Sequence, residues 1–91
     1  GLNVVLHISM DQHTPERFEA FEARVAELPE VVECLLITGQ EADYQLRIWV
    51  ADMDDYQRIL LQHITRIAGV SGVHTSFVLR RVMPARGLPP R

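Results

Sequence analysis

The chain of 91 residues is 47% hydrophobic and 23% charged, which excludes a disordered protein and suits one domain with a single core. Its net charge of -3, with arginine as the only strongly basic residue type, excludes a basic surface for nucleic acid. No apolar run approaches the roughly 20 residues that cross a bilayer, and the first residues do not form a secretory signal, so we expect a cytoplasmic protein without a membrane segment.

The first two predicted elements are a strand and a helix. Residues 4–10 alternate between apolar and mixed positions, with the period of two that strands have. Thr14, Pro15 and Glu16 then form a helix start, with a capping hydroxyl, a proline at the first position and an acid in the first turn. We predict a strand over 4–10 and a helix over 15–28, which Pro29 ends.

The next two elements form a hairpin. Residues 31–38 are rich in branched apolar side chains, which favour an extended chain. Residues 44–50 alternate between apolar and polar positions after a short loop. A short loop joins strands antiparallel, so we predict that these two strands pair.

A second helix and a last strand complete the order. Asp52 and Asp55 have a spacing like that of a capping box, and the apolar residues after them fall on one helical face. We predict that this helix ends near Ala68 and Gly69. A strand over 73–82 follows, before a tail over 84–91 in which proline and glycine break regular structure.

The order strand, helix, strand, strand, helix, strand predicts the fold. Right-handed crossovers place both helices on one face of a four-stranded antiparallel sheet. We therefore predict an α+β protein with a ferredoxin-like βαββαβ sandwich over residues 1–83, followed by the tail over 84–91.

Two helices on one face leave the other face of the sheet uncovered. By alternation this open face carries Val5, His7, Ser9, Gln45, Arg47, Trp49, His74, Ser76, Val78 and Arg80. Such a face is too apolar for a fully hydrated surface, so we expect a dimer in which two open faces pack against each other. The alternative is a monomer in which Arg47 and Arg80 cover Trp49.

The loop between the two hairpin strands contains a glycine and a carboxylate. A loop of this kind can place the backbone N–H groups near Gly39 and the fixed charge of Asp43 side by side. Such a loop is suited to hold a small zwitterion. The alternative is that Gly39 only adopts a positive φ in the turn and that Asp43 only accepts hydrogen bonds from loop amides.

Several short strings of this sequence form a recognisable set: Leu28-Pro29, Val31-Val32-Glu33-Cys34, Thr38-Gly39 with Asp43-Tyr44, Leu46-Arg47-Ile48, Ala51-Asp52-Met53 with Tyr56, and Gly69-Val70 with Thr75. Together they resemble the C-terminal ligand-binding and oligomerisation domain, or RAM domain, of the Lrp/AsnC (feast/famine) transcriptional regulators. The resemblance implies dimers that pair through their sheets, assembly into tetramers, octamers or larger rings, and an amino-acid effector between dimers. DNA would be contacted only through an N-terminal helix-turn-helix, which this sequence lacks. The chain is therefore expected to be a stand-alone domain or the C-terminal part of a regulator.

The resemblance also implies a set of effector-binding residues. In it, loop N–H groups donate to the effector carboxylate and Asp43 pairs with the ammonium, while hydroxyl groups of the last strand complete the site. Three residues separate Gly39 from Asp43, where the family usually has two, and the extra residue either forms a bulge or brings Glu41 toward the pocket. A second carboxylate there favours a cationic ligand or none. The expected site residues are Thr38, Gly39, Gln40, Asp43, Tyr44, Thr75 and Ser76.

The histidines of the chain raise an enzyme as the alternative class of function. His7, His63 and His74 raise the alternative of a dimeric ferredoxin-like monooxygenase, but they form no dense ligand cluster, and no glycine-rich loop resembles a phosphate cradle. We therefore expect no enzyme, no metal and no cofactor. The lone Cys34 is expected to be a small buried hydrophobic residue. An ACT domain would need a glycine in the first loop, and residues 10–13 contain none.

Overall fold

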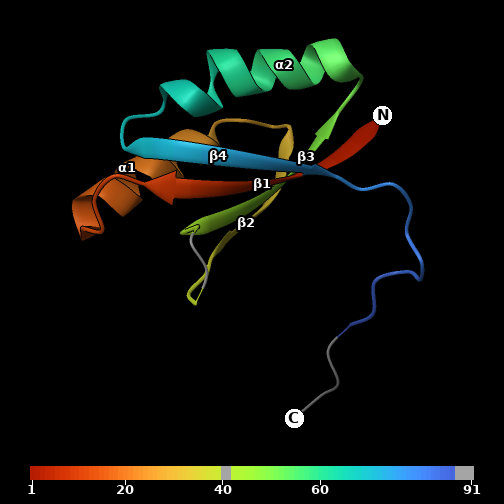
Figure 1. Ribbon diagram of the computed structural model, residues 1–91, viewed down its shortest axis with the longest axis horizontal. Helices are drawn as coiled ribbons and strands as arrows, with labels where there is room; N and C mark the ends of the chain where they lie inside the picture. Colours follow the sequence, from red (N-terminus) through yellow and green to blue (C-terminus); the bar gives the residue numbers. More distant parts are fainter. Residues whose placement is uncertain (40–41, 88–91) are drawn as a thin grey trace.

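The computed structural model describes residues 1–39 and 42–87 and has the predicted element order (Figure 1). Four strands form one sheet in the order β2-β3-β1-β4, with every neighbouring pair antiparallel. This arrangement confirms the ferredoxin-like sandwich. The elements are β1 (Leu2–Met10), α1 (Pro15–Ala26), β2 (Val31–Leu36), β3 (Tyr44–Val50), α2 (Met53–Gln62), the short 3-10 helix η1 (Ile64–Arg66) and β4 (Val70–Phe77).

Both helices begin at side-chain caps, as predicted. The hydroxyl oxygen of Thr14 accepts the backbone N–H of Arg17 at 3.2 Å before α1. Before α2, Asp52 Oδ1 accepts the N–H of Asp55 at 2.8 Å, and Asp55 Oδ2 accepts the N–H of Ala51 at 2.9 Å. These bonds satisfy backbone donors that have no partner within the first turn, so they set where each helix starts.

The core lies between the sheet and the two helices. Alternate residues of β1 and β3 face it, and the helices contribute a second layer of apolar side chains. Fully burying one such side chain stabilises the fold by about 1.5–3 kcal/mol before entropy is counted. The side chains with no measurable exposure are Val4, Leu6, Ile8, Phe21, Leu46, Ile48, Ile59 and Ile64.

The second helix ends earlier than predicted. The helix ends at Gln62, and His63 has φ -125° and ψ -64°, outside the helical region. A 3-10 turn follows and still places Ile64 and Ile67 in the core. The apolar spacing that predicted a longer helix therefore reflects which side chains are buried, and a 3-10 turn buries the same side chains.

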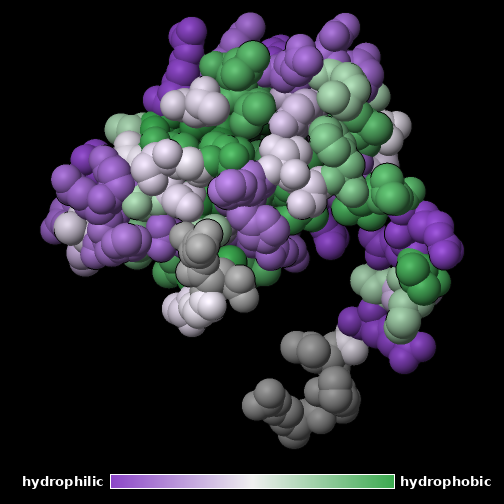
Figure 2. All heavy atoms as spheres, in the orientation of Figure 1, coloured by the Kyte–Doolittle hydropathy of each residue, from purple (hydrophilic) through white to green (hydrophobic). Residues whose placement is uncertain are grey.

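The last strand was predicted over 73–82 but spans Val70–Phe77. Pairing with β1 ends at Val4 and Phe77, and the N–H of Val78 then donates to the carbonyl of Asn3 at 3.0 Å. The described residues after Val78 have no strand to pair with, so β4 ends at Phe77. Figure 2 shows the following segment extending from the body, with hydrophobic and hydrophilic residues interleaved along it.

The register confirms the composition of most of the open face. His7 lies opposite Gln45 on one side and His74 on the other, and Val5 lies in the same way between Arg47 and Ser76. Trp49 is opposite Asn3 and is 55% exposed. The edge strand β2 adds Glu33, opposite Arg47, and Leu35, opposite Gln45.

Candidate ligand-binding site at the β2–β3 loop

The loop between β2 and β3 closes the hairpin with a glycine in the left-handed region. Gly39 has φ +86°, and a Cβ atom added there would meet nothing within 4 Å. The N–H of Ile37 donates to the carbonyl of Asp43 at 2.9 Å across the loop. Gly39 therefore has a conformational role in the turn. The predicted site residue Gln40 and the extra acid Glu41 lie outside the described residues.

Asp43 joins the loop to the end of β1. Its Oδ2 accepts the backbone N–H of Met10 at 2.8 Å, and its own N–H donates to the carbonyl of Ile8 at 2.8 Å. Its Oδ1 accepts Nε2–H of His13 at 2.9 Å, and the His13 side chain is 63% exposed. Oδ2 of Asp43 thus binds the backbone of Met10, while Oδ1 binds the exposed side chain of His13, which can move away.

Tyr44 faces the helices. Its hydroxyl donates to Glu22 Oε2 at 2.5 Å, and its ring packs against Phe18 and Phe21 with centroid separations of 5.6 and 4.5 Å. Burial raises the pKa of the Tyr44 phenol, and the hydrogen bond and charge of Glu22 raise it further. The phenol therefore stays protonated and acts as a donor.

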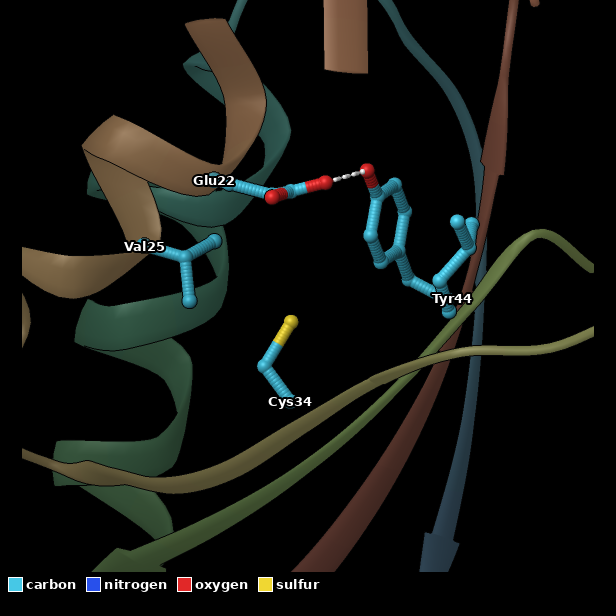
Figure 3. Close-up of a pocket in the computed structure, with 5 residues that line it drawn as sticks. Glu22, Val25, Cys34 and Tyr44 are labelled. Carbon is cyan, nitrogen blue, oxygen red and sulfur yellow. Dashed lines mark hydrogen bonds between the residues drawn. The ribbon is translucent and has the colours of Figure 1, made fainter. Parts of the chain in front are cut away.

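A hollow of about 330 Å³ lies beside Tyr44, between α1 and the edge strand β2 (Figure 3). Glu22 supplies its carboxylate, and the remaining wall is largely apolar. Glu22 was not among the predicted site residues, although its place one turn after Phe18 puts it on the side of α1 that faces the sheet. The lining residues are Glu22, Val25, Cys34, Leu36 and Tyr44.

Cys34 is exposed, so the prediction of a buried cysteine was wrong. Its strand β2 is the edge of the sheet, where one side has no neighbouring strand to cover it. The walls of the hollow still desolvate the thiol, and this desolvation, with the nearby charge of Glu22, raises the pKa of Cys34. A raised pKa leaves little thiolate at neutral pH and makes the thiol a poor nucleophile.

Thr75 and Ser76 lie apart from the loop and on opposite faces of the sheet. Thr75 is opposite Leu6 and shares a hydrogen bond of 2.8 Å with the hydroxyl of Tyr56 on the helix side. Ser76 is opposite Val5 on the open face. Because β1 separates β4 from β3, one copy of the chain does not bring these hydroxyls to the loop. Thr75 instead lines a second hollow, of about 340 Å³, with Leu60, Thr65, Val70, Ser71, Gly72 and Val73.

Within residues 1–39 and 42–87, no group of three or more histidine, cysteine, aspartate or glutamate side chains is placed to hold a metal ion. None of the helices described is long and apolar enough to span a membrane. We take Thr38, Gly39, Asp43 and the hollow beside Tyr44 as the candidate site.

Comparison with known proteins decides the family. A model of the Lrp/AsnC ligand binding domain matches residues 3–88. The chain belongs to the Lrp/AsnC ligand-binding domain family. This Lrp/AsnC domain is 37% identical over 90 residues to the Bkd operon transcriptional regulator of Pseudomonas aeruginosa, covering 99% of the chain and 58% of the relative.

Two further similarities agree with this assignment. The Lrp/AsnC domain is 34% identical to the leucine-responsive regulatory protein of Salmonella typhimurium, covering 97% of the chain and 53% of that protein. Its fold matches a transcriptional regulator from Neisseria meningitidis in complex with L-Met, with a TM-score of 0.88, 30% identity, and coverage of 98% of this chain and 56% of that one. The chain thus spans about half the length of the curated relatives it matches.

Proposed function

We propose that this domain binds an amino acid or a related small molecule between dimers and couples it to assembly. The change in assembly would then alter how tightly an attached or partner helix-turn-helix binds DNA. The observation that carries the proposal is the loop that holds Gly39 at a positive φ and fixes the Asp43 carboxylate on the N–H of Met10, in a chain of the Lrp/AsnC family. The relatives named above are transcriptional regulators, which supports a role without catalysis.

The contacts of Asp43 supply a route for an effector ammonium. The bond from Asp43 Oδ2 to Met10 N–H holds the carboxylate in place. The bond from Oδ1 goes to His13, whose side chain is largely exposed. An ammonium that displaces His13 gains a charge-assisted hydrogen bond without disturbing the backbone contact. The effector carboxylate would then face the loop N–H groups near Gly39.

A second copy of the domain would complete the site. Thr75 and Ser76 are two strands away from the loop in the same chain, so we propose that hydroxyls from a neighbouring copy, and not from the same copy, meet the effector. This placement makes binding depend on assembly. The effector then favours the assembled state by mass action.

The open face of the sheet is proposed as the dimer contact. It presents Trp49 and Leu35, which are 55% and 44% exposed. Apolar side chains of this size gathered on one face mark an interaction surface, and two sheets pack face to face about 10 Å apart. The centre of this face is polar, because His7 and Gln45 lie opposite each other there, with Nε2 and Oε1 3.2 Å apart.

A thermal-shift screen with the twenty amino acids tests effector binding. We expect one or a few of them to raise the melting temperature of the wild type and not of Asp43→Ala. Asp54→Ala is the matched control, because it removes an exposed carboxylate from the first turn of α2. Equal shifts in all three proteins, or no shift in the wild type, would contradict the effector site.

Light scattering coupled to size exclusion tests the dimer. Trp49→Glu places a charge in the proposed contact and should give a monomer. Leu61→Glu is the matched control, because Leu61 is 58% exposed but lies on α2, away from the open face. A monomeric wild type, or a dimer in both variants, would contradict the pairing of open faces.

A further inference from the structure

Two histidines lie directly opposite each other on the open face. His7 on β1 and His74 on β4 are register partners in an antiparallel pair. His74 is exposed and His7 is half-buried. The Cβ atoms of such a pair lie about 4.5–5.5 Å apart on the same face, which brings two imidazoles within reach of one ion.

Gln45 orients the His7 ring from the other side. The Nε2 atom of His7 lies 3.2 Å from Gln45 Oε1, an amide oxygen that can only accept. When Nε2 donates to this oxygen, Nδ1 keeps its lone pair. A histidine that binds a metal through one nitrogen and donates from the other to an oxygen is the usual arrangement in metal sites.

The residue pairs on either side of the two histidines are uncharged and leave space for an ion. On one side of the histidine pair, the next pair is Ser9 and Gly72, which are small. On the other side it is Val5 and Ser76. The nearest cation by register is Arg47, opposite Val5, and it lies beside the carboxylate-bearing Glu33 on β2.

We propose that His7 and His74 bind a divalent transition metal ion that prefers imidazole, such as Zn²⁺, Ni²⁺ or Cu²⁺. Two nitrogen ligands do not suit Mg²⁺ or Ca²⁺, which take oxygen ligands. Within the described residues no third histidine, cysteine or carboxylate joins the pair. Water, or the same two histidines of a second copy, therefore supplies the remaining positions of the coordination sphere.

Pairing of open faces would place this ion between two copies. Four imidazoles from two copies then match the four ligands that Zn²⁺ takes in closed sites. Binding to the paired state but not to single copies would stabilise the dimer by mass action. The stoichiometry of binding separates one ion per chain from one ion per two chains, and both results fit the proposal.

Calorimetric titration of the full, tag-free chain with ZnCl₂ tests the site. We expect saturable binding to the wild type and at least tenfold weaker binding to His74→Ala, an exposed position where folding tolerates the change. His63→Ala and His13→Ala are matched controls, since each removes one imidazole elsewhere, and both should bind Zn²⁺ like the wild type. No binding to the wild type, equal binding to His74→Ala, or loss only in His13→Ala would overturn the proposal.

A second pair of variants tests the orienting role of Gln45. Loss of such an outer partner typically weakens metal affinity about 10–100-fold, so Gln45→Leu should bind Zn²⁺ more weakly. Gln45→Glu keeps an acceptor for Nε2–H and should retain binding. Nuclear magnetic resonance of the imidazole C–H groups should show His7 and His74 as the two rings shifted by Zn²⁺. Shifts confined to His13 or His63 would place the ion elsewhere and refute the site.

Discussion

Tyr44 donates a hydrogen bond of 2.5 Å to Glu22, across the gap between β3 and α1. The residue before it, Asp43, holds the backbone of Met10 at the end of β1. The start of β3 is therefore tied to the first helix and to the first strand by two adjacent side chains. A ligand that moves this loop would act on both elements.

Tyr44→Phe should lower the free energy of unfolding by about 1 kcal/mol, the usual net value of one hydrogen bond. The effect stays modest because Glu22 is exposed and water can replace the phenol. Urea denaturation measures it, with Tyr56→Phe as a control that removes the bond to Thr75 instead. Wild-type stability in Tyr44→Phe would show that the bond contributes nothing.

The raised pKa of Tyr44 predicts a loss of stability in strong base. The folded state favours the protonated phenol, so this contribution is complete below the ordinary tyrosine pKa of about 10 and is lost as the pH rises above it. Absorbance at 295 nm should show a tyrosine fraction that ionises late, and that fraction should be missing in Tyr44→Phe. Ionisation of all tyrosine in one step near pH 10, without unfolding, would contradict the burial of Tyr44.

Asp43→Ala should cost about 1–3 kcal/mol, because it leaves the partly buried N–H of Met10 without its acceptor. Asp43→Asn keeps an amide oxygen for that N–H and should cost clearly less. Denaturation of both variants without any ligand measures this structural role separately from effector binding. Equal losses in the two variants would show that charge, and not the acceptor, is what matters at this position.

The two glycines with positive φ should respond differently to alanine. Gly39→Ala meets no atom within 4 Å and should cost only the backbone penalty of about 1–2 kcal/mol. Gly69→Ala has the same penalty at φ +97°, and its Cβ would also lie 2.5 Å from Arg17 Cδ and 2.9 Å from Met10 Cε. Its loss should therefore be larger. Thermal melting of the two variants ranks them, and the opposite order would contradict the packing around Gly69.

Asp55 predicts a loss of stability in acid. The N–H of Ala51 and the guanidinium of Arg58 lower the pKa of Asp55 in the folded state. Its contribution is present above the ordinary pKa of 3.8 and is lost as the pH falls below it. Denaturation at pH 7 and pH 3 should show a smaller acid loss in Asp55→Asn than in the wild type. Identical pH dependence in both proteins would rule out this contribution.

The amino-acid sequence by itself determined the elements and their order. Alternation with a period of two placed β3 at the same bounds, Tyr44 to Val50, that the structure has. Thr14 and Asp52 marked the helix starts. A capping side chain bonds to the N–H of a residue three positions ahead, so the pattern can be recognised in the sequence. The family resemblance also rested on such local strings, and the comparisons confirmed it.

Contacts between distant residues were decided only by the tertiary structure. The bond from His13 to Asp43 joins residues 30 apart, and no spacing rule connects them. Cys34 is exposed because β2 became the edge of the sheet, and α2 ends at Gln62 because a tighter turn buries Ile64 equally well. The separation of Thr75 from the loop follows from strand order, since β1 lies between β3 and β4. Each of these facts depends on which strands are neighbours, and that depends on the packing of the whole chain.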